Sequence, residues 1–167
     1  MFKDILPGIE PFLSTILSDL DDLGLDVSNY YLDHVCFRTT SLEEYDQLKD
    51  SISAIAQLLS EAMIAGRPIA SYQLNEAIHF ANRKIEVIEI PSPKVGKVVN
   101  SGFEHAEFVI DVSFEDFIDR YPNITFDTSS ITKRHNPELK VSLGAYTVKF
   151  HHKALKEVIA IERAQQQ

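Results

Sequence analysis

Two stretches of similar character decide the fold: YYLDHVCFRTT at residues 30–40 and FEHAEFVIDV at residues 103–112. Both are rich in aromatic and β-branched residues, which favours β-strands. Because alternate residues of a strand share a face, His34 shares a face with Cys36, and His105 shares a face with Glu107. Each strand therefore presents a histidine near its start, at matching positions.

The residues after the first strand predict a helix and then three strands. Ser41 and Glu44 form a capping box, which marks the start of a helix. The stretch LLSEAMIAGRPIASYQL (58–74) predicts two short strands around a turn, and KIEVIEIP (84–91) predicts a third that stops at its proline.

The same order of elements follows the second strand. Ser113 is placed to cap a short helix that ends before Pro122. The stretches ITFDTSS (124–130) and ELKVSLGAYTVKFHH (138–152) then predict three further short strands. Strand, helix and three strands thus occur twice, which predicts an α+β domain built from two similar halves.

Helical patterns flank the two halves. Apolar residues recur at helical spacing from Ile9 to Leu23, and a final helix is expected from Leu155 to Ala164. We therefore expect a single domain over residues 1–167, with these parts: an N-terminal helical extension (1–28), the first βαβββ module (29–92), a linker (93–102), the second βαβββ module (103–152) and a C-terminal helix (153–167).

Composition and charge narrow the class of protein. The chain carries 16 Lys and Arg against 25 Asp and Glu, a net charge of −9, which disfavours nucleic acid and anionic membranes as partners. Cys36 is the single cysteine, so no disulfide can form within the chain. No stretch reaches the length of a membrane span, and the first residues lack a signal-peptide pattern. We expect a cytoplasmic protein.

The last strand of each half also carries ligand-type side chains. In the first half these are Glu86 and Glu89, on opposite faces; in the second they are Lys149 and His151, on one face. Imidazole and carboxylate groups together suit a divalent ion such as Zn, Fe, Mn, Co or Ni. The repeated position of the two first-strand histidines strengthens this interpretation.

Other roles for the same residues remain open. A histidine in a strand is most often a hydrogen-bonded boundary residue, and strand glutamates often discourage edge pairing. Cys36 is expected to be a small buried apolar residue. Arg38 and Lys149 either are solvated or bind an anionic ligand, and Arg67 either belongs to a hairpin turn or binds an anion.

The chain resembles the vicinal oxygen chelate superfamily, which includes glyoxalase I, extradiol dioxygenases and methylmalonyl-CoA epimerase. Within it, five blocks are similar to the YecM-like family of uncharacterised bacterial proteins: DHVCFRT, LSEAMIAGRPI, IEIPSP, FEHAEFVI and VKFHH. The resemblance covers residues 33 to 152, and the N-terminal helix is also present in that family. It implies two βαβββ modules paired into an open, curved, eight-stranded barrel.

The resemblance also implies a metal site, whose ligands come from the first and last strands of each module. Carried over residue by residue, the ligands are His34, Glu89, His105 and His151, with Glu86 as the alternative to Glu89. Many superfamily members have a glutamate where this chain has His151. Glu107 is the candidate base or substitute ligand, and Arg38, Lys149 and Arg67 are the candidate substrate-binding residues.

Three functions remain as hypotheses. The first is a metal-dependent isomerase, lyase or oxidoreductase of dioxygenase type, acting on a small oxygen-rich molecule, acidic molecules included. The second is a non-catalytic protein that binds or sequesters a small molecule or metal in the same cleft. The third is a regulatory interaction domain. A complete pair of modules in one chain is compatible with a monomer, although the sequence leaves the oligomeric state open.

Overall fold

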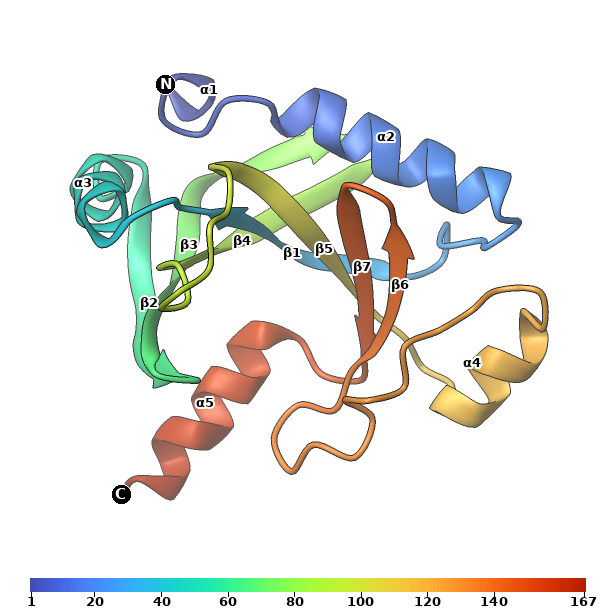
Figure 1. The fold of residues 1–167 in the computed structure, drawn as a ribbon. Coiled ribbons are helices and arrows are strands. Elements are labelled where there is room, and N and C mark those ends of the chain that lie inside the picture. Colours follow the sequence, from blue (N-terminus) through green and yellow to red (C-terminus); the bar gives the residue numbers. More distant parts are fainter.

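Seven strands form one curved, mixed sheet with five helices around it, in a computed structural model of residues 1–167 (Figure 1). The strands are β1 (Tyr31–Arg38), β2 (Ala56–Ile64), β3 (Arg67–Phe80), β4 (Arg83–Pro91), β5 (Gly102–Val109), β6 (Leu139–Leu143) and β7 (Tyr146–His151). The helices are α1 (Phe2–Ile5), α2 (Ile9–Asp22), α3 (Leu42–Ile52), α4 (Phe114–Arg120) and α5 (Leu155–Gln165). The predicted α+β class is confirmed.

The sheet has a local two-fold pattern about the antiparallel pair β1–β5. The strand order is β2-β3-β4-β1-β5-β7-β6, and the pairs β1–β4 and β5–β7 are the parallel ones. In the central pair His34 lies opposite Glu107, and Cys36 lies opposite His105. A two-fold axis between these pairs relates His34 to His105 and Cys36 to Glu107. The predicted similarity of the two halves therefore appears directly in the strand register.

The predicted count of eight strands is wrong, because residues 124–130 do not form a strand. This segment joins the sheet through one bridge, between Asp127 and Lys140. Asp127 Oδ1 accepts a hydrogen bond from the backbone N–H of Ser129, and the local turn that results ends further pairing. In the first half, by contrast, β2 and β3 are longer than expected and meet at a turn in which Ala65 and Gly66 have positive φ.

Side-chain caps fix the start of two helices, as expected. Ser41 Oγ accepts a hydrogen bond from the Glu44 N–H, and Ser113 Oγ accepts one from the Asp116 N–H, each at 3.0 Å. The glutamate of the first box reaches back one residue further than in the standard motif, since its carboxylate accepts from the Thr40 N–H at 2.6 Å.

The two faces of the central strands have different environments. Val35 and Phe37 belong to the main hydrophobic core, which α2 covers. Phe12 of α2 packs on Phe103 and on Tyr146, with ring centroids 5.2 and 4.9 Å apart. The alternate residues of β1, including His34, point to the opposite side of the sheet and are also buried. One face of the sheet thus holds the core, and the other holds buried polar side chains.

Helix α5 crosses from the end of β7 towards the opposite edge strand, β2 (Figure 1). Near its C-terminal end, Arg163 donates a hydrogen bond to the carbonyl oxygen of Leu59. None of the five helices combines the length and the apolar character that crossing a membrane would require.

Candidate metal centre

The β1–β5 pair brings the two first-strand histidines to a shared carboxylate. His105 Nε2 lies 3.1 Å from Glu107 Oε1, and His34 Nε2 lies 3.5 Å from the same oxygen. All three side chains are buried, and the two imidazole rings are 6.5 Å apart between centroids. Matching positions in two related strands therefore lead to one site.

Each of these histidines is held by the acidic residue directly before it in the sequence. His34 Nδ1 donates to Asp33 Oδ2 at 2.8 Å, and His105 Nδ1 donates to Glu104 Oε2. Adjacent strand residues normally face opposite sides, but Asp33 and Glu104 have no partner across the β1–β5 pair, which marks a β-bulge at each. The bulge lets an acid and its neighbouring histidine meet.

The hydrogen bonds at Nδ1 determine what the other ring nitrogen can do. A carboxylate only accepts, so Nδ1 carries the proton in the neutral ring, and Nε2 then presents its lone pair. Neither His34 Nε2 nor His105 Nε2 has a hydrogen-bond partner, although both are buried. A carboxylate that orients a histidine whose far nitrogen is free is the usual arrangement around a metal-binding histidine. These donor atoms therefore fit a divalent ion.

Glu89 completes a group of three ligand-type residues. The ligand atoms of His34, Glu89 and His105 all lie within 4.8 Å of one another, and Glu89 Oε1 is 3.9 Å from His105 Nε2. Glu86 instead pairs with Lys84 at 2.9 Å. The structure thus brings Glu89, of the two alternatives, to the histidines.

Lys149 stands at the position related to Glu89 by the two-fold pattern. Glu89 lies beside Cys36 in the β1–β4 pair, and Lys149 lies beside Glu107 in the β5–β7 pair. Its Nζ is 3.4 Å from Glu107 Oε1 and 3.7 Å from an oxygen of Glu138. Burial alone would lower the pKa of Lys149, but these carboxylates raise it, so the ammonium persists. One half offers a carboxylate where the other offers a cation.

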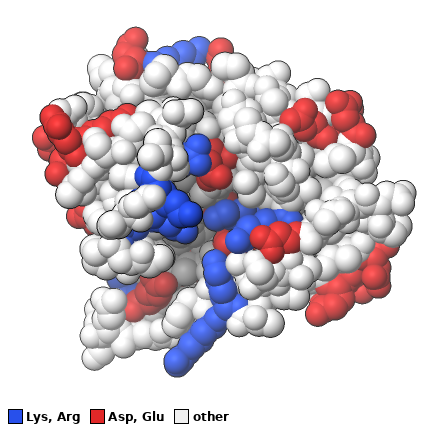
Figure 2. All heavy atoms as spheres, viewed as in Figure 1, with Lys and Arg blue, Asp and Glu red and all other residues white.

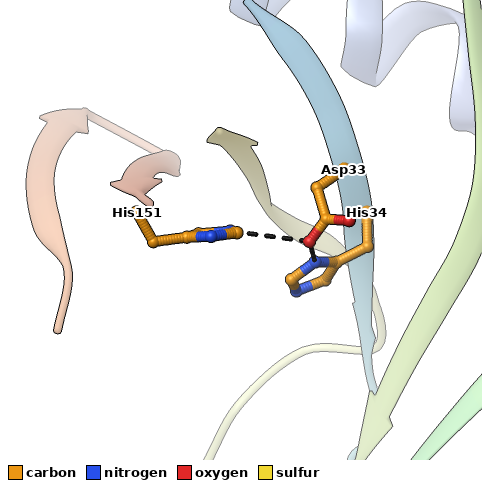
Figure 3. A group of neighbouring side chains, drawn as sticks. All are labelled: Asp33, His34 and His151. Atoms are coloured by element: carbon orange, nitrogen blue, oxygen red, sulfur yellow. Dashed lines mark hydrogen bonds and ion pairs between the residues drawn. The ribbon is translucent and has the colours of Figure 1, made fainter. Parts of the chain in front are cut away.

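His151 lies on the other side of Glu107. Its Nε2 is 3.2 Å from Glu107 Oε2. The same nitrogen is 3.5 Å from Asp33 Oδ2, which lies between His151 and His34 in Figure 3. Both ring nitrogens of His151 are buried and lack a hydrogen-bond partner. It pairs with Val109, two residues beyond the Lys149 pair. His151 therefore joins the cluster of buried and half-buried polar side chains formed by His34, Glu89, His105, Glu107 and Lys149. It is not the two-fold counterpart of Glu89.

The protonation state of the cluster follows from its burial and its charges. Burial lowers the pKa of His34, but the Glu107 carboxylate and the hydrogen bond to Asp33 outweigh it and raise the pKa to about 10. Burial acts on Glu107 in the opposite sense, yet His34 and Lys149 hold its pKa well below the usual range. Without an ion, protons on the histidines therefore compensate the buried carboxylate.

Cys36 is buried beside His105, and its Sγ lies within 4.8 Å of ligand atoms of Glu104 and His105. Burial raises the pKa of this thiol, which keeps it protonated and unreactive. The structure agrees with the expectation that Cys36 is a buried residue.

The three candidate substrate-binding residues have different positions. Lys149 is in the cluster, and Arg38 is close enough to affect Glu104. Burial raises the pKa of Glu104, but the hydrogen bond and charge of His105 and the charges of Lys149 and Arg38 lower it. Arg67 donates to the carbonyl oxygen of Ser92 at 2.7 Å and lines a separate hollow of about 390 Å³ against residues 92–97. The structure does not bring Arg67 to the histidines.

Basic side chains gather on one face in spite of the overall negative charge. Figure 2 shows Lys and Arg atoms around a hollow near the centre of this face, between β2 and the β6–β7 pair, with acidic atoms beside them. Of the charged side chains around the histidines, Glu89, Lys149 and Glu104 are partly exposed (18%, 20% and 24%). These partly exposed side chains are the part of the site that is in contact with solvent.

Asp33 and Glu104 are not among the site residues predicted from the sequence. The available signal was the dipeptide itself, since an acid precedes the histidine at the same position of both first strands. A regular strand would have put the acid on the opposite face, and the bulges could not be foreseen from residue type alone.

Two comparisons of the sequence with known proteins identify the same family. A family model described as YecM protein matches residues 2–162. The chain is similar to protein YecM of Escherichia coli strain K12, with 29% identity over 177 residues, 97% of this chain and 94% of that protein.

Two solved structures are similar in fold. A structural-genomics protein, EC4020, superimposes with a TM-score of 0.75 and 28% identity over 91% of this chain and 87% of its own. A hypothetical protein from Bacillus halodurans, BH1468, superimposes with a TM-score of 0.53 and 17% identity over 75% of this chain and 96% of its own.

Proposed function

The chain belongs to the YecM protein family, and from that premise we propose that it binds a divalent metal ion at the β1–β5 pair. The observation that carries the proposal is the convergence of buried, unpartnered imidazole nitrogens on carboxylates. Leaving such nitrogens unpaired is costly, whereas an ion would satisfy them together.

His34, Glu89 and His105 are the proposed principal ligands. Two histidines and one carboxylate suit Zn or Fe and leave coordination positions open to a substrate. His151 is the proposed fourth ligand, and its position beside Glu107 Oε2 gives it a second possible role in orienting that carboxylate. Glu107 is the proposed base or substitute ligand, because its carboxylate is within 3.5 Å of the nitrogens of both first-strand histidines.

A metal-dependent isomerase, lyase or oxidoreductase is the reaction class that we favour. A bound divalent ion would supply Lewis acidity towards two neighbouring oxygens of a substrate. Glu107 would take the proton from the adjacent carbon, and Lys149 and Arg38 would attract an acidic group of the substrate. The basic surroundings of the hollow in Figure 2 support a small anionic substrate.

A second candidate is a non-catalytic protein that holds a metal or small molecule in the same place. It is favoured by the depth of the cluster, since His34 and His151 are at most 1% exposed. A site that encloses its ion leaves little room for a substrate to enter. For either function, we propose that the protein is cytoplasmic.

Metal binding tests the proposal directly. We expect tag-free protein to bind about one Zn²⁺, and His34→Ala or His105→Ala to weaken binding by ~10-fold or more while the fold is kept. His79→Ala, which changes an exposed histidine, is the control, and His151→Ala decides whether that residue is a ligand. Less than roughly 0.1 equivalents of bound Zn²⁺, Fe²⁺, Mn²⁺, Co²⁺ or Ni²⁺ after incubation with each would refute the proposal.

Proton exchange then separates an enzyme from a binding protein. The metal-loaded protein is incubated in D₂O with small 2-hydroxy and 2-keto acids, and deuterium at the carbon beside the carbonyl is followed by NMR. An enzyme of the proposed class incorporates deuterium, and Glu107→Gln abolishes it. Tight metal binding without exchange on any of these acids favours the non-catalytic alternative.

A further inference from the structure

Asp33 makes more contacts than the orientation of one histidine requires. Its Oδ2 accepts a hydrogen bond from His34 Nδ1 and a second from the backbone N–H of Leu155, each at 2.8 Å. The side chain is 1% exposed. A single buried oxygen thus joins a proposed metal ligand in β1 to the first residue of α5.

The contact with Leu155 replaces a missing helix cap. Ala154 occupies the N-cap position of α5 and has no side chain that could accept a hydrogen bond. Helices begin with N–H groups that lack partners within the helix, and a negative charge at this end is favourable. Asp33, from a strand 122 residues earlier, supplies both the acceptor and the charge.

Glu104 provides an internal comparison. It occupies the same bulge position in β5 and accepts from His105 Nδ1 in the same way, but no hydrogen bond or ion pair joins it to a helix. Asp33 and Glu104 therefore each orient a histidine, but only Asp33 also accepts a hydrogen bond from α5. The far end of α5 is fastened separately, by Arg163 on the β2 carbonyl of Leu59.

We infer that Asp33 is a positioning residue that couples the docking of α5 to metal binding at His34. The inference rests on the proposed metal site. When α5 is docked, the Leu155 N–H holds the Asp33 carboxylate in the place from which it orients the His34 ring. Because coupling between two events is reciprocal, metal binding stabilises the docked helix by the same factor by which docking strengthens metal binding.

Hydrogen exchange of the α5 amides tests the coupling without measuring activity. The probes are the amides of Val158 and Ile159 in the first turns of α5, followed in the full-length protein with and without saturating Zn²⁺. We expect Zn²⁺ to slow their exchange by about 10-fold in the wild type and in Glu104→Gln, and not in Asp33→Asn.

A second pair of variants leaves Asp33 intact. Leu155→Pro removes the N–H donor at a helix position that accepts proline, and the extended conformation of Ala154 (φ −60°, ψ 147°) suits a residue before proline. Leu155→Ala keeps the donor and loses a similar amount of side-chain packing. We expect Leu155→Pro to bind Zn²⁺ about 5-fold or more weakly than Leu155→Ala.

The outcomes separate this inference from the proposed function. If the wild type binds Zn²⁺ but the exchange of Val158 and Ile159 does not respond, the coupling is refuted and the metal site stands. Equal Zn²⁺ affinity of Leu155→Pro and Leu155→Ala refutes it as well. A wild type that binds none of the metals overturns the proposed function itself.

Discussion

The ion-free protein is expected to lose stability as the pH rises from 7.0 to 8.5. His34 has a pKa of about 10 in the folded protein against 6.5 for an ordinary histidine. The folded state therefore retains a proton that the unfolded chain releases in this range. The resulting stabilisation is fully present below pH 6.5 and is lost as the pH rises towards 10.

The size of the effect follows from the number of protons retained. One retained proton lowers the free energy of unfolding by about 1.4 kcal/mol per pH unit, which gives about 2 kcal/mol over this range. The pKa of His105 is also raised well above its ordinary value, so a second proton would steepen the slope. Above pH 9 the Cys36 thiol, whose pKa burial raises, contributes in the same direction. Between pH 7.0 and 8.5 the change in stability therefore reports the histidine protons without the contribution of Cys36.

Urea denaturation in the presence of a chelator measures this slope. His34→Gln should flatten it, since glutamine carries no titratable proton, whereas His79→Gln at an exposed position should leave it unchanged. A stability that is constant or increases between pH 7.0 and 8.5 in the wild type would contradict the assignment of a retained proton to the cluster.

Two further predictions concern charge and packing. Lys149→Gln removes a cation 3.4 Å from Glu107 and should strengthen Zn²⁺ binding by about 10-fold in a competition assay with a chromophoric chelator; unchanged or weaker binding would show that the ammonium does not oppose the ion. Phe117→Ala removes a buried ring whose centroid is 4.7 Å from that of Phe150 and should cost about 3–5 kcal/mol in urea unfolding with the Zn²⁺ stoichiometry unchanged. A cost below about 1 kcal/mol would mean that this part of the core is loosely packed.

Much of the fold could be predicted because its signals are local. The caps at Ser41 and Ser113 mark helix starts by side-chain chemistry, and alternation in the first strands indicates the face of each residue outside the two bulges. The missing strand at residues 124–130 could not be predicted in the same way. Its composition allows a strand, but a turn at Asp127 leaves a single bridge to Lys140.

The candidate site was predictable where it depends on symmetry and not where it depends on register. His34 and His105 follow from their matching positions in two similar strands. The choice between Lys149 and His151 as the counterpart of Glu89 depends on the register of β7 against β5. In this register Glu107 pairs with Lys149. Such pairing is set by contacts distant in sequence, so residue type alone does not reveal it.

The antiparallel β1–β5 pair has a consequence for how the protein folds. Each half supplies one of the two facing histidines, and neither half contains both, so the pocket exists only after the halves have joined. Contacts between residues this far apart in the chain tend to form late, because closing the intervening loop costs entropy. A bound ion would accordingly decrease the unfolding rate of the native protein far more than it would increase the folding rate.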